Sequence, residues 1–360
     1  MSEFNFNAVE ENETVLLPKM LSKGVFKNQI ELIDPLRLKE LTALIIGAGS
    51  VGSNLVHTMN KFGFSSFIIY DYDIWEVHNS ASSIYPFKET EAQAPYCKRS
   101  YDQWTYYPTR PVDKEEIDLP PYSIFKVDIL KREIERNDPN IYYEEYRLPF
   151  GESMINAFTK FNQSIDKIGA RRMFTNEGQP RRSSMGVMKF DWIPKVKPDY
   201  MVLTTDTLQS RARCVWALRS MFKNDVWGET EGVFPVIDTR SLNTTQGEIL
   251  VFDLMNDQDV HDWFNYSLPH KARMEFKDME NVLNDDIENV EQIGFIDTEP
   301  NLCGDKMSIL ISNTISVYAT NLIVNIFNGK VEWEKIPRSY LINTSPLMPY
   351  VTKNAKLLNE

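Results

Sequence analysis

Three glycines between two apolar runs form the first set of residues in this sequence that could do chemistry. The stretch "ALIIGAGSVGSNLVHTMNKFGFSSFIIYDYD" places Gly47, Gly49 and Gly52 after one apolar run and Asp71 at the end of the next. The first glycine permits a tight turn, the second lets a phosphate approach the backbone, and the third permits close packing of the following helix. Free amides at the start of that helix, around Ser50, attract an anion. The stretch therefore predicts a nucleotide site.

The glycines do not select the nucleotide, because Asp71 can accept hydrogen bonds from the ribose of NAD or of ATP. The residues that follow are more selective. A second acid, Asp73, is followed by Asn79 and then by Lys98. This set suits a triphosphate and its metal, and hydride transfer does not need it. ATP is therefore favoured, and a nicotinamide-dependent oxidoreductase is the less favoured alternative.

The same residues resemble the signature of the ThiF/MoeB/HesA family, in the superfamily of ubiquitin-activating enzymes. That signature is a GxGxxG turn, a D-x-D-x-V-E-x-x-N segment, a lysine after it, and an Asp at a later strand end. The resemblance runs from about residue 22 to 330. It includes "FKNQIELIDPLRLKELTALIIGAG", "IERNDPNIYYEEY", "DYMVLTTDTLQSRARC", "FPVIDTRSLNTTQGEILVFD" and "LCGDKMSILISNTISVYATNLIVNIFNG".

The resemblance implies roles for individual residues. The glycine turn would cradle the phosphates, Asp71 would hold the ribose, and Asp73 and Asn79 would shape the floor of the site. Lys98 would neutralise phosphate charge, and Asp206 would hold Mg²⁺. The implied reaction is attack of a C-terminal carboxylate on the α-phosphate of ATP, which gives an acyl-adenylate and pyrophosphate. The implied partner is a small ubiquitin-like or sulfur-carrier-like protein, or a peptide, with a flexible tail. A homodimer is also expected.

Four further residues have two interpretations each. Arg211, at the family's arginine position, either assists catalysis or forms a structural ion pair. Cys303 matches a position that commonly holds a cysteine, and it is either a thioester nucleophile or a packed residue. Asp238 and Arg240 either line the substrate groove or form a structural ion pair. Cys214 is expected in the core.

The chain departs from the family pattern at three polar positions. Ser82 stands where the family has an arginine after the Asn, Ser83 where it has a glutamine, and Asn28 where it has its lead-in arginine. One phosphate-contacting arginine can be worth ~10³ or more in phosphoryl chemistry. A catalytically degenerate scaffold that binds a partner, and perhaps nucleotide, is therefore the alternative function.

Apolar runs that alternate with helical patterns predict the elements that position these residues. Strands are expected at 43–47, 66–70, 140–146, 199–205, 233–239 and 247–254, and helices at 51–62, 126–136, 207–222 and 308–327. This order predicts the α/β class, with a Rossmann-like, mostly parallel central sheet and helices on both faces. A smaller antiparallel portion is expected at the C-terminal side of the sheet.

The domain prediction is one adenylation domain over residues 22–330, with loop insertions at about 105–123 and 150–197. Residues 1–21 are expected to form an N-terminal extension and residues 331–360 a C-terminal tail. Proline and charge favour surface loops in the insertions.

Composition narrows the function classes. The net charge of −12 over 360 residues argues against nonspecific nucleic-acid binding. Three separated cysteines exclude a disulfide scaffold and a zinc site with four thiolates. The first residues lack a signal-peptide pattern, and the uncharged run 308–328 is rich in Ser, Thr and Asn. Because of those polar residues, the run 308–328 is expected to form a buried helix and not a membrane span. The protein is expected to be cytoplasmic, without a membrane partner.

Overall fold

The computed structural model describes most of the predicted elements. The residues described are 34–73, 75–85, 125–147, 150, 194–223, 226–227, 232–267, 309–344 and 350–354. Insertion 105–123 and most of insertion 150–197 lie outside these ranges, so their interpretation as surface loops stays a prediction.

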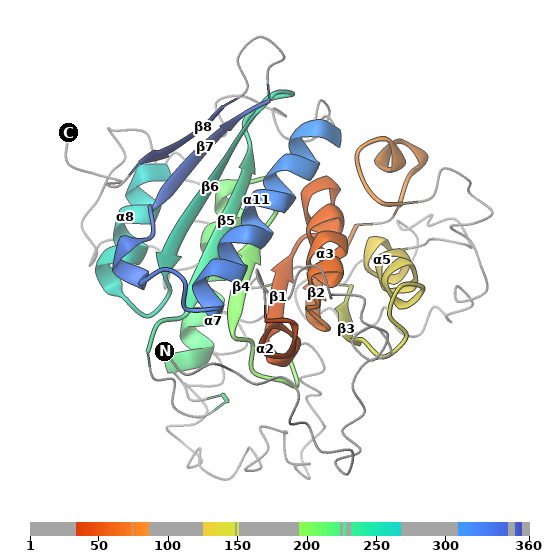
Figure 1. The fold of residues 1–360 in the computed structure, drawn as a ribbon, viewed down its shortest axis with the longest axis horizontal. Coiled ribbons are helices and arrows are strands. Elements are labelled where there is room, and N and C mark those ends of the chain that lie inside the picture. The colour runs from red at the N-terminus through yellow and green to blue at the C-terminus, as the bar shows by residue number, and fades with distance from the viewer. Residues whose placement is uncertain are drawn as a thin grey trace, which may run out of the picture.

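One eight-stranded sheet, in the order β3-β2-β1-β4-β5-β6-β7-β8, forms the centre of the molecule (Figure 1). Its strands are β1 (Thr42–Ile46), β2 (Ser66–Tyr70), β3 (Tyr142–Tyr146), β4 (Tyr200–Leu203), β5 (Pro235–Ser241), β6 (Gln246–Asp253), β7 (Ser339–Asn343) and β8 (Tyr350–Asn354). The five neighbouring strands β3, β2, β1, β4 and β5 pair in parallel. Strands β6, β7 and β8 each pair antiparallel with the strand before them in this order. The predicted fold class, a Rossmann-like sheet with an antiparallel C-terminal portion, is confirmed.

Strands β1 and β4 are buried on both sides because helices cover both faces of the sheet. Every residue of β1 and of β4 is buried. Ala43 and Ile45 of β1 join the core on one face, whereas Leu44 and Ile46 join the core on the other. This alternation explains why the strands read as continuous apolar runs in the sequence.

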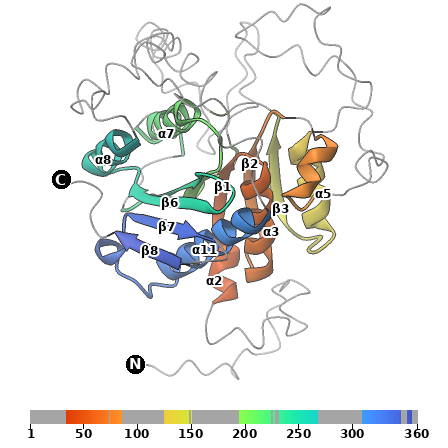
Figure 2. The ribbon, with the colours of Figure 1, turned by 90° about the horizontal axis from the view of Figure 1, so that it is seen from above.

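Two helical layers enclose the sheet (Figure 2). One layer contains α3 (Ser50–Phe62), α5 (Lys126–Glu135) and α11 (Ile309–Phe327), and the other contains α7 (Leu208–Lys223) and α8 (Asp257–Ser267). A short helix, α2 (Pro35–Glu40), precedes β1, and the side chain of Asp34 caps its first amides. All of these helices except α2 and α8 were predicted.

Helix α11 packs small polar side chains against α3, as its sequence predicted. The hydroxyl of Ser316 donates to the carbonyl of Val51 over 3.1 Å, and Ser312 contacts Ser50. Within the described ranges, α11 is the one helix long and apolar enough to cross a membrane by length and composition, and 44% of its apolar window is buried. This is weak evidence for a membrane, because core helices pass the same test.

The sheet extends beyond residue 330. Residues 331–360 were expected as a tail, but they contribute a short 3-10 helix, η5 (Trp333–Lys335), and both β7 and β8. Strand β7 pairs with β6, and Ile342 is fully buried in the core. The sheet therefore includes residues as far as Asn354.

Candidate functional site

Several of the predicted site residues, namely the glycine turn, Asp71 and Asp206, lie where the strand order reverses. Strand β1 is flanked by β2 on one side and by β4 on the other. In open α/β sheets, ligands bind outside the carboxyl ends of the strands at such a switch point. The glycine turn follows β1, Asp71 follows β2, and Asp206 follows β4, so all three lie at this edge.

The glycine turn is braced by the loop after β4. Gly47 has φ +104°, a conformation that favours glycine. The hydroxyl of Thr204 lies 2.9 Å from the carbonyl oxygens of both Ile46 and Gly47. A Cβ on Gly52 would overlap the carbonyl oxygen of Gly47 and crowd Thr204. Two of the three glycines are therefore required by packing.

Gly49 is different, because a Cβ there would meet nothing within 4 Å. It is the N-cap of α3, and no described side chain caps the first amides of that helix. The open space and the free amides fit a phosphate group. The hydroxyl of Ser50 donates to the carbonyl of Ser82 over 2.5 Å and contacts Ser312. Any contact of Ser50 with a phosphate is therefore left to its backbone amide.

Asp71 is held by two backbone amides. Its Oδ2 accepts from Ala48 over 2.5 Å, and its Oδ1 accepts from Asp73 over 2.7 Å. The pKa of Asp71 is raised to about 6, mainly by burial, while Lys126 opposes the shift and Asp73 adds to it. The carboxylate that was predicted to hold the ribose is thus fixed in orientation beside the glycine turn.

Lys126 is a cation at this edge that was not among the predicted site residues. Its Nζ lies 2.7 Å from Oδ2 of Asp73, and only 11% of its side chain is exposed. Burial alone would lower the pKa of Lys126, but Asp71, Asp73 and Asp206 together raise it. One lysine therefore interacts with all three acids of the site. Lys98, the predicted cation, lies outside the described residues.

A signal for Lys126 was present in the sequence. It begins the predicted helix that leads into "IERNDPNIYYEEY", a passage that resembles the family. Like Lys98, it follows the D-x-D segment along the chain.

Asp206 lies exposed in the loop between β4 and α7. Desolvation by its surroundings raises the pKa of Asp206, and Arg211 and Lys126 oppose that shift. Beside it, the hydroxyl oxygen of Thr205 is buried and has no hydrogen-bond partner among the residues described.

The residues at this edge fit Mg²⁺ bound together with a nucleotide, rather than alone. The described part of the chain holds no group of three or more His, Cys, Asp or Glu side chains that could bind a metal by itself. Mg²⁺ is usually held by one or two carboxylates together with substrate phosphates and water. Asp206 could supply such a carboxylate, and the unpartnered Thr205 hydroxyl could bind a ligand group.

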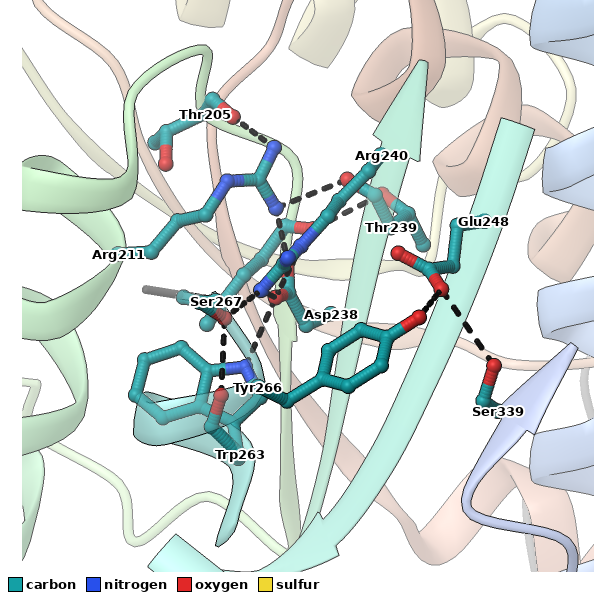
Figure 3. Close-up of polar contacts among 11 residues, drawn as sticks. Thr205, Arg211, Asp238, Thr239, Arg240, Glu248, Trp263, Tyr266, Ser267 and Ser339 are labelled. Carbon is teal, nitrogen blue, oxygen red and sulfur yellow. Dashed lines mark hydrogen bonds and ion pairs between the residues drawn. The ribbon is translucent and has the colours of Figure 1, made fainter. Parts of the chain in front are cut away.

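Arg211 forms the structural ion pair rather than a free catalytic cation (Figure 3). Its Nη1 contacts Oδ1 of Asp238 and donates to the carbonyl of Thr239 over 2.9 Å. Its Nη2 donates to the carbonyl of Thr205. Only 5% of the Arg211 side chain is exposed.

Asp238 and Arg240 also form an ion pair. Nε and Nη2 of Arg240 lie 2.9 and 2.6 Å from Oδ2 of Asp238, and Trp263 Nε1 donates to the same oxygen. Nη2 of Arg240 also contacts the hydroxyl of Ser267 over 2.6 Å. Burial alone would raise the pKa of Asp238, but Arg211 and Arg240 hold it below its usual value. Of the two interpretations, the ion pair is observed.

The segment after Asp73 forms a 3-10 helix, η1 (Val77–Ala81). Oδ1 of Asn79 accepts the amide of Glu76 over 2.8 Å, and the two residues form a capping box. The hydroxyl of Ser83 contacts the carbonyl of Asn79. The carbonyl of Ser82 accepts from Ser50 and, over 2.9 Å, from Asn54. These residues therefore brace the start of α3, and Asn79 is used in the turn itself.

Cys214 is buried, as predicted, and burial raises the pKa of its thiol to about 12. Its Sγ contacts the carbonyl of Phe150 over 3.4 Å. Cys214 therefore has a packing role. Cys303 and Asn28 lie outside the described residues, so their interpretations stay predictions.

Comparison with known proteins gives a distant likeness of fold. No protein-family model and no curated protein matches the sequence. E. coli MccB with MccA has TM-score 0.47 and 12% identity, over 89% of this chain and 65% of that chain. E. coli MccB with ATP has TM-score 0.46 and 11% identity over the same shares. PaaA has TM-score 0.48 and 12% identity, over 98% of this chain and 87% of that chain.

This chain thus spans just under two thirds of MccB. Its class is a Rossmann-like α/β protein with an antiparallel extension. At 11–12% identity, the likeness to these structures concerns the fold alone.

Proposed function

We propose that this protein is an ATP-dependent adenylyltransferase that activates a C-terminal carboxylate as an acyl-adenylate. The acyl substrate is a small ubiquitin-like or sulfur-carrier-like protein, or a peptide with a flexible tail. The observation that carries the proposal is the position of Lys126. Its Nζ lies 2.7 Å from Oδ2 of Asp73, at the strand edge that also holds the glycine turn. Asp71 and Asp206 lie close enough to raise the pKa of Lys126.

Each residue has a task in this reaction. The amides after Gly49 hold the phosphates, and Asp71 accepts hydrogen bonds from the ribose. Lys126 exchanges its contact with Asp73 for a phosphate oxygen and neutralises charge on the departing pyrophosphate. Asp206 holds Mg²⁺, which supplies further charge neutralisation to the phosphates.

The acyl carboxylate is already ionised, so the site needs no strong base. A carboxylate oxygen forms a bond to the α-phosphorus of ATP. The bond from that phosphorus to the bridging oxygen breaks, and pyrophosphate leaves with the electron pair. Such a displacement depends on positioning and charge neutralisation, and the residues at this edge are of the types that supply both.

Hydride transfer does not need a lysine among three acids, because the nicotinamide itself supplies the chemistry. This favours ATP over NAD. The E. coli MccB structures contain ATP and MccA. We propose a nucleotide and a peptide-like partner for this chain on the residues above, independently of that distant likeness. A homodimer remains part of the proposal.

A catalytically degenerate scaffold is the second candidate, and the segment 75–85 favours it. Ser82 and Ser83, at the family's arginine and glutamine positions, brace the start of α3 and the turn of η1. The described segment contains no arginine. A scaffold would bind nucleotide and partner but would not cleave ATP.

Exchange between ATP and labelled pyrophosphate, with candidate partners that end in a free Gly-Gly tail, separates the two candidates. We expect partner-dependent exchange in the wild type and a loss of about a hundredfold or more in Asp206→Ala. Asp262→Ala, which removes an acid from α8, is the matched control and should exchange normally. Nucleotide binding without exchange would support the scaffold, and undiminished exchange in Asp206→Ala would refute the enzyme as described.

A further inference from the structure

Asp238 is a buried carboxylate that the proposed reaction does not use. None of its surface is exposed. It belongs to strand β5 and is not part of the glycine turn that follows β1. Its two oxygens bind Arg211, Arg240 and Trp263 (Figure 3). A fully buried charge is costly unless it is paired. Asp238 therefore depends on its two arginine partners, and it fixes where their guanidinium groups lie.

Arg211 is attached to both sides of the Asp206 loop. Its side chain donates to the carbonyl of Thr205, and its backbone amide donates to the carbonyl of Thr207 over 3.2 Å. The guanidinium is close enough to lower the pKa of Asp206. Even so, the ion pair that Arg211 forms in the described structure is with Asp238, and none joins it to Asp206.

We propose that Asp238 is a positioning residue that holds Arg211 away from Asp206 and so keeps the Asp206 carboxylate available to a divalent cation. The inference rests on the proposed function for the identity of the site, but it concerns cation binding and not the chemical step. A guanidinium is a planar fork that matches both oxygens of a carboxylate. If Arg211 turned to Asp206, it would occupy the oxygens that a cation needs and would repel that cation.

The charge balance of the cluster supports this assignment. Arg240 has a second acid nearby, because Glu248 lies opposite it in the register of β5 and β6. Glu248 itself accepts from the hydroxyls of Tyr266 and Ser339. Among the residues described, the ion pair of Arg211 is with Asp238. Once Asp238 is neutral, the Asp206 carboxylate, whose pKa the Arg211 guanidinium already affects, can attract that guanidinium.

The test measures the affinity of Mn²⁺ in the presence of an ATP analogue that cannot be cleaved between its α- and β-phosphates. Electron paramagnetic resonance counts free Mn²⁺ during the titration. Asp238→Asn should weaken Mn²⁺ binding about tenfold, the lower end of the effect of an opposite charge arriving at a carboxylate. The double variant Arg211→Met/Asp238→Asn should return the affinity to within about threefold of wild type, because the competing cation is gone.

Two further variants keep the result interpretable. Ser267→Ala removes a contact of Arg240 on the far side of the cluster and should leave Mn²⁺ affinity unchanged. Arg211→Met alone should bind Mn²⁺ at least as tightly as wild type, and it tests the idea even if Asp238→Asn does not fold.

Three results would overturn the proposal. The first is a folded Asp238→Asn protein that binds Mn²⁺ with wild-type affinity. The second is equal weakening of Mn²⁺ binding in Asp238→Asn and in Arg211→Met/Asp238→Asn. The third is weaker Mn²⁺ binding in Arg211→Met than in wild type. A wild type that binds no Mn²⁺ would overturn it too, together with the metal assignment. A wild type that binds Mn²⁺ but exchanges no pyrophosphate would overturn the proposed function alone.

Discussion

Replacing Lys126 with methionine keeps most of the length of the side chain and removes its charge. In the wild type its Nζ lies 2.7 Å from Asp73, and its pKa is raised by all three acids of the site. The variant leaves those acids without this cation. Because Lys126 opposes the shift, the pKa of Asp71, already raised to about 6, should rise further.

The size of the effect follows from the exposure of the two partners. The Asp73 side chain is 48% exposed, so its ion pair with Lys126 contributes about 1 kcal/mol or less to folding. A charge-assisted hydrogen bond to phosphate is worth about 1.5–3 kcal/mol, so ATP affinity should fall roughly ten- to a hundredfold. Binding should therefore suffer far more than stability.

Calorimetric titration with Mg·ATP and chemical denaturation measure the two effects. Lys131→Met is the matched control, because Lys131 lies on the same helix and pairs with Glu145 over 2.9 Å, away from the three acids. It should bind ATP normally. If Lys126→Met bound ATP within about twofold of the control, the assignment of Lys126 to the phosphates would be refuted.

Three other predictions concern the glycine turn, Asp71 and Cys214. Gly52→Ala should destabilise the fold by about 1–3 kcal/mol, because its methyl would overlap the carbonyl of Gly47. Gly49→Ala places its methyl in open space, so this variant should keep the wild-type melting temperature but bind ATP more weakly. Equal melting curves and equal ATP affinities for Gly49→Ala and Gly52→Ala would contradict this. The pKa of Asp71 is raised from 3.8 to about 6, so the folded state holds this proton more tightly than the unfolded state. Protonation of Asp71 should therefore stabilise the fold as pH falls through 6. The same protonation should lower the affinity for ATP, which a fluorescence titration measures. An ATP affinity that stays flat from about pH 5 to 8 would count against the role of Asp71. Because burial raises the pKa of Cys214 to about 12, iodoacetamide should label it after unfolding and not before, as peptide mass spectrometry can check.

The parallel half of the fold could be predicted because its strands are buried on both faces. The runs 43–46 and 200–203 are apolar, and helical patterns separate them. Strands β7 (SYLIN) and β8 (YVTKN) are short and partly polar, and they pair antiparallel at the end of the sheet. Nothing in their local pattern distinguished them from an irregular tail.

The site could be predicted only in part, for a different reason. Glycines and acids that follow strands are readable, because carboxyl ends of parallel strands share one edge. The contact between Lys126 and Asp73 joins residues far apart in the chain and depends on how α5 packs against the sheet. The ion pair of Arg211 with Asp238 likewise depends on the pairing of β4 with β5. Such contacts cannot be read from the local sequence, even where the residue itself, like Lys126, begins a predicted helix.

The central claim is that the edge between β1 and β4 binds ATP with a divalent cation. Titrating the wild-type protein with Mg·ATP and, separately, with NAD tests it most directly. We predict saturable one-to-one binding of Mg·ATP that weakens when Mg²⁺ is removed, and no comparable binding of NAD. Binding of NAD as tight as that of ATP, or no binding of Mg·ATP, would contradict the claim.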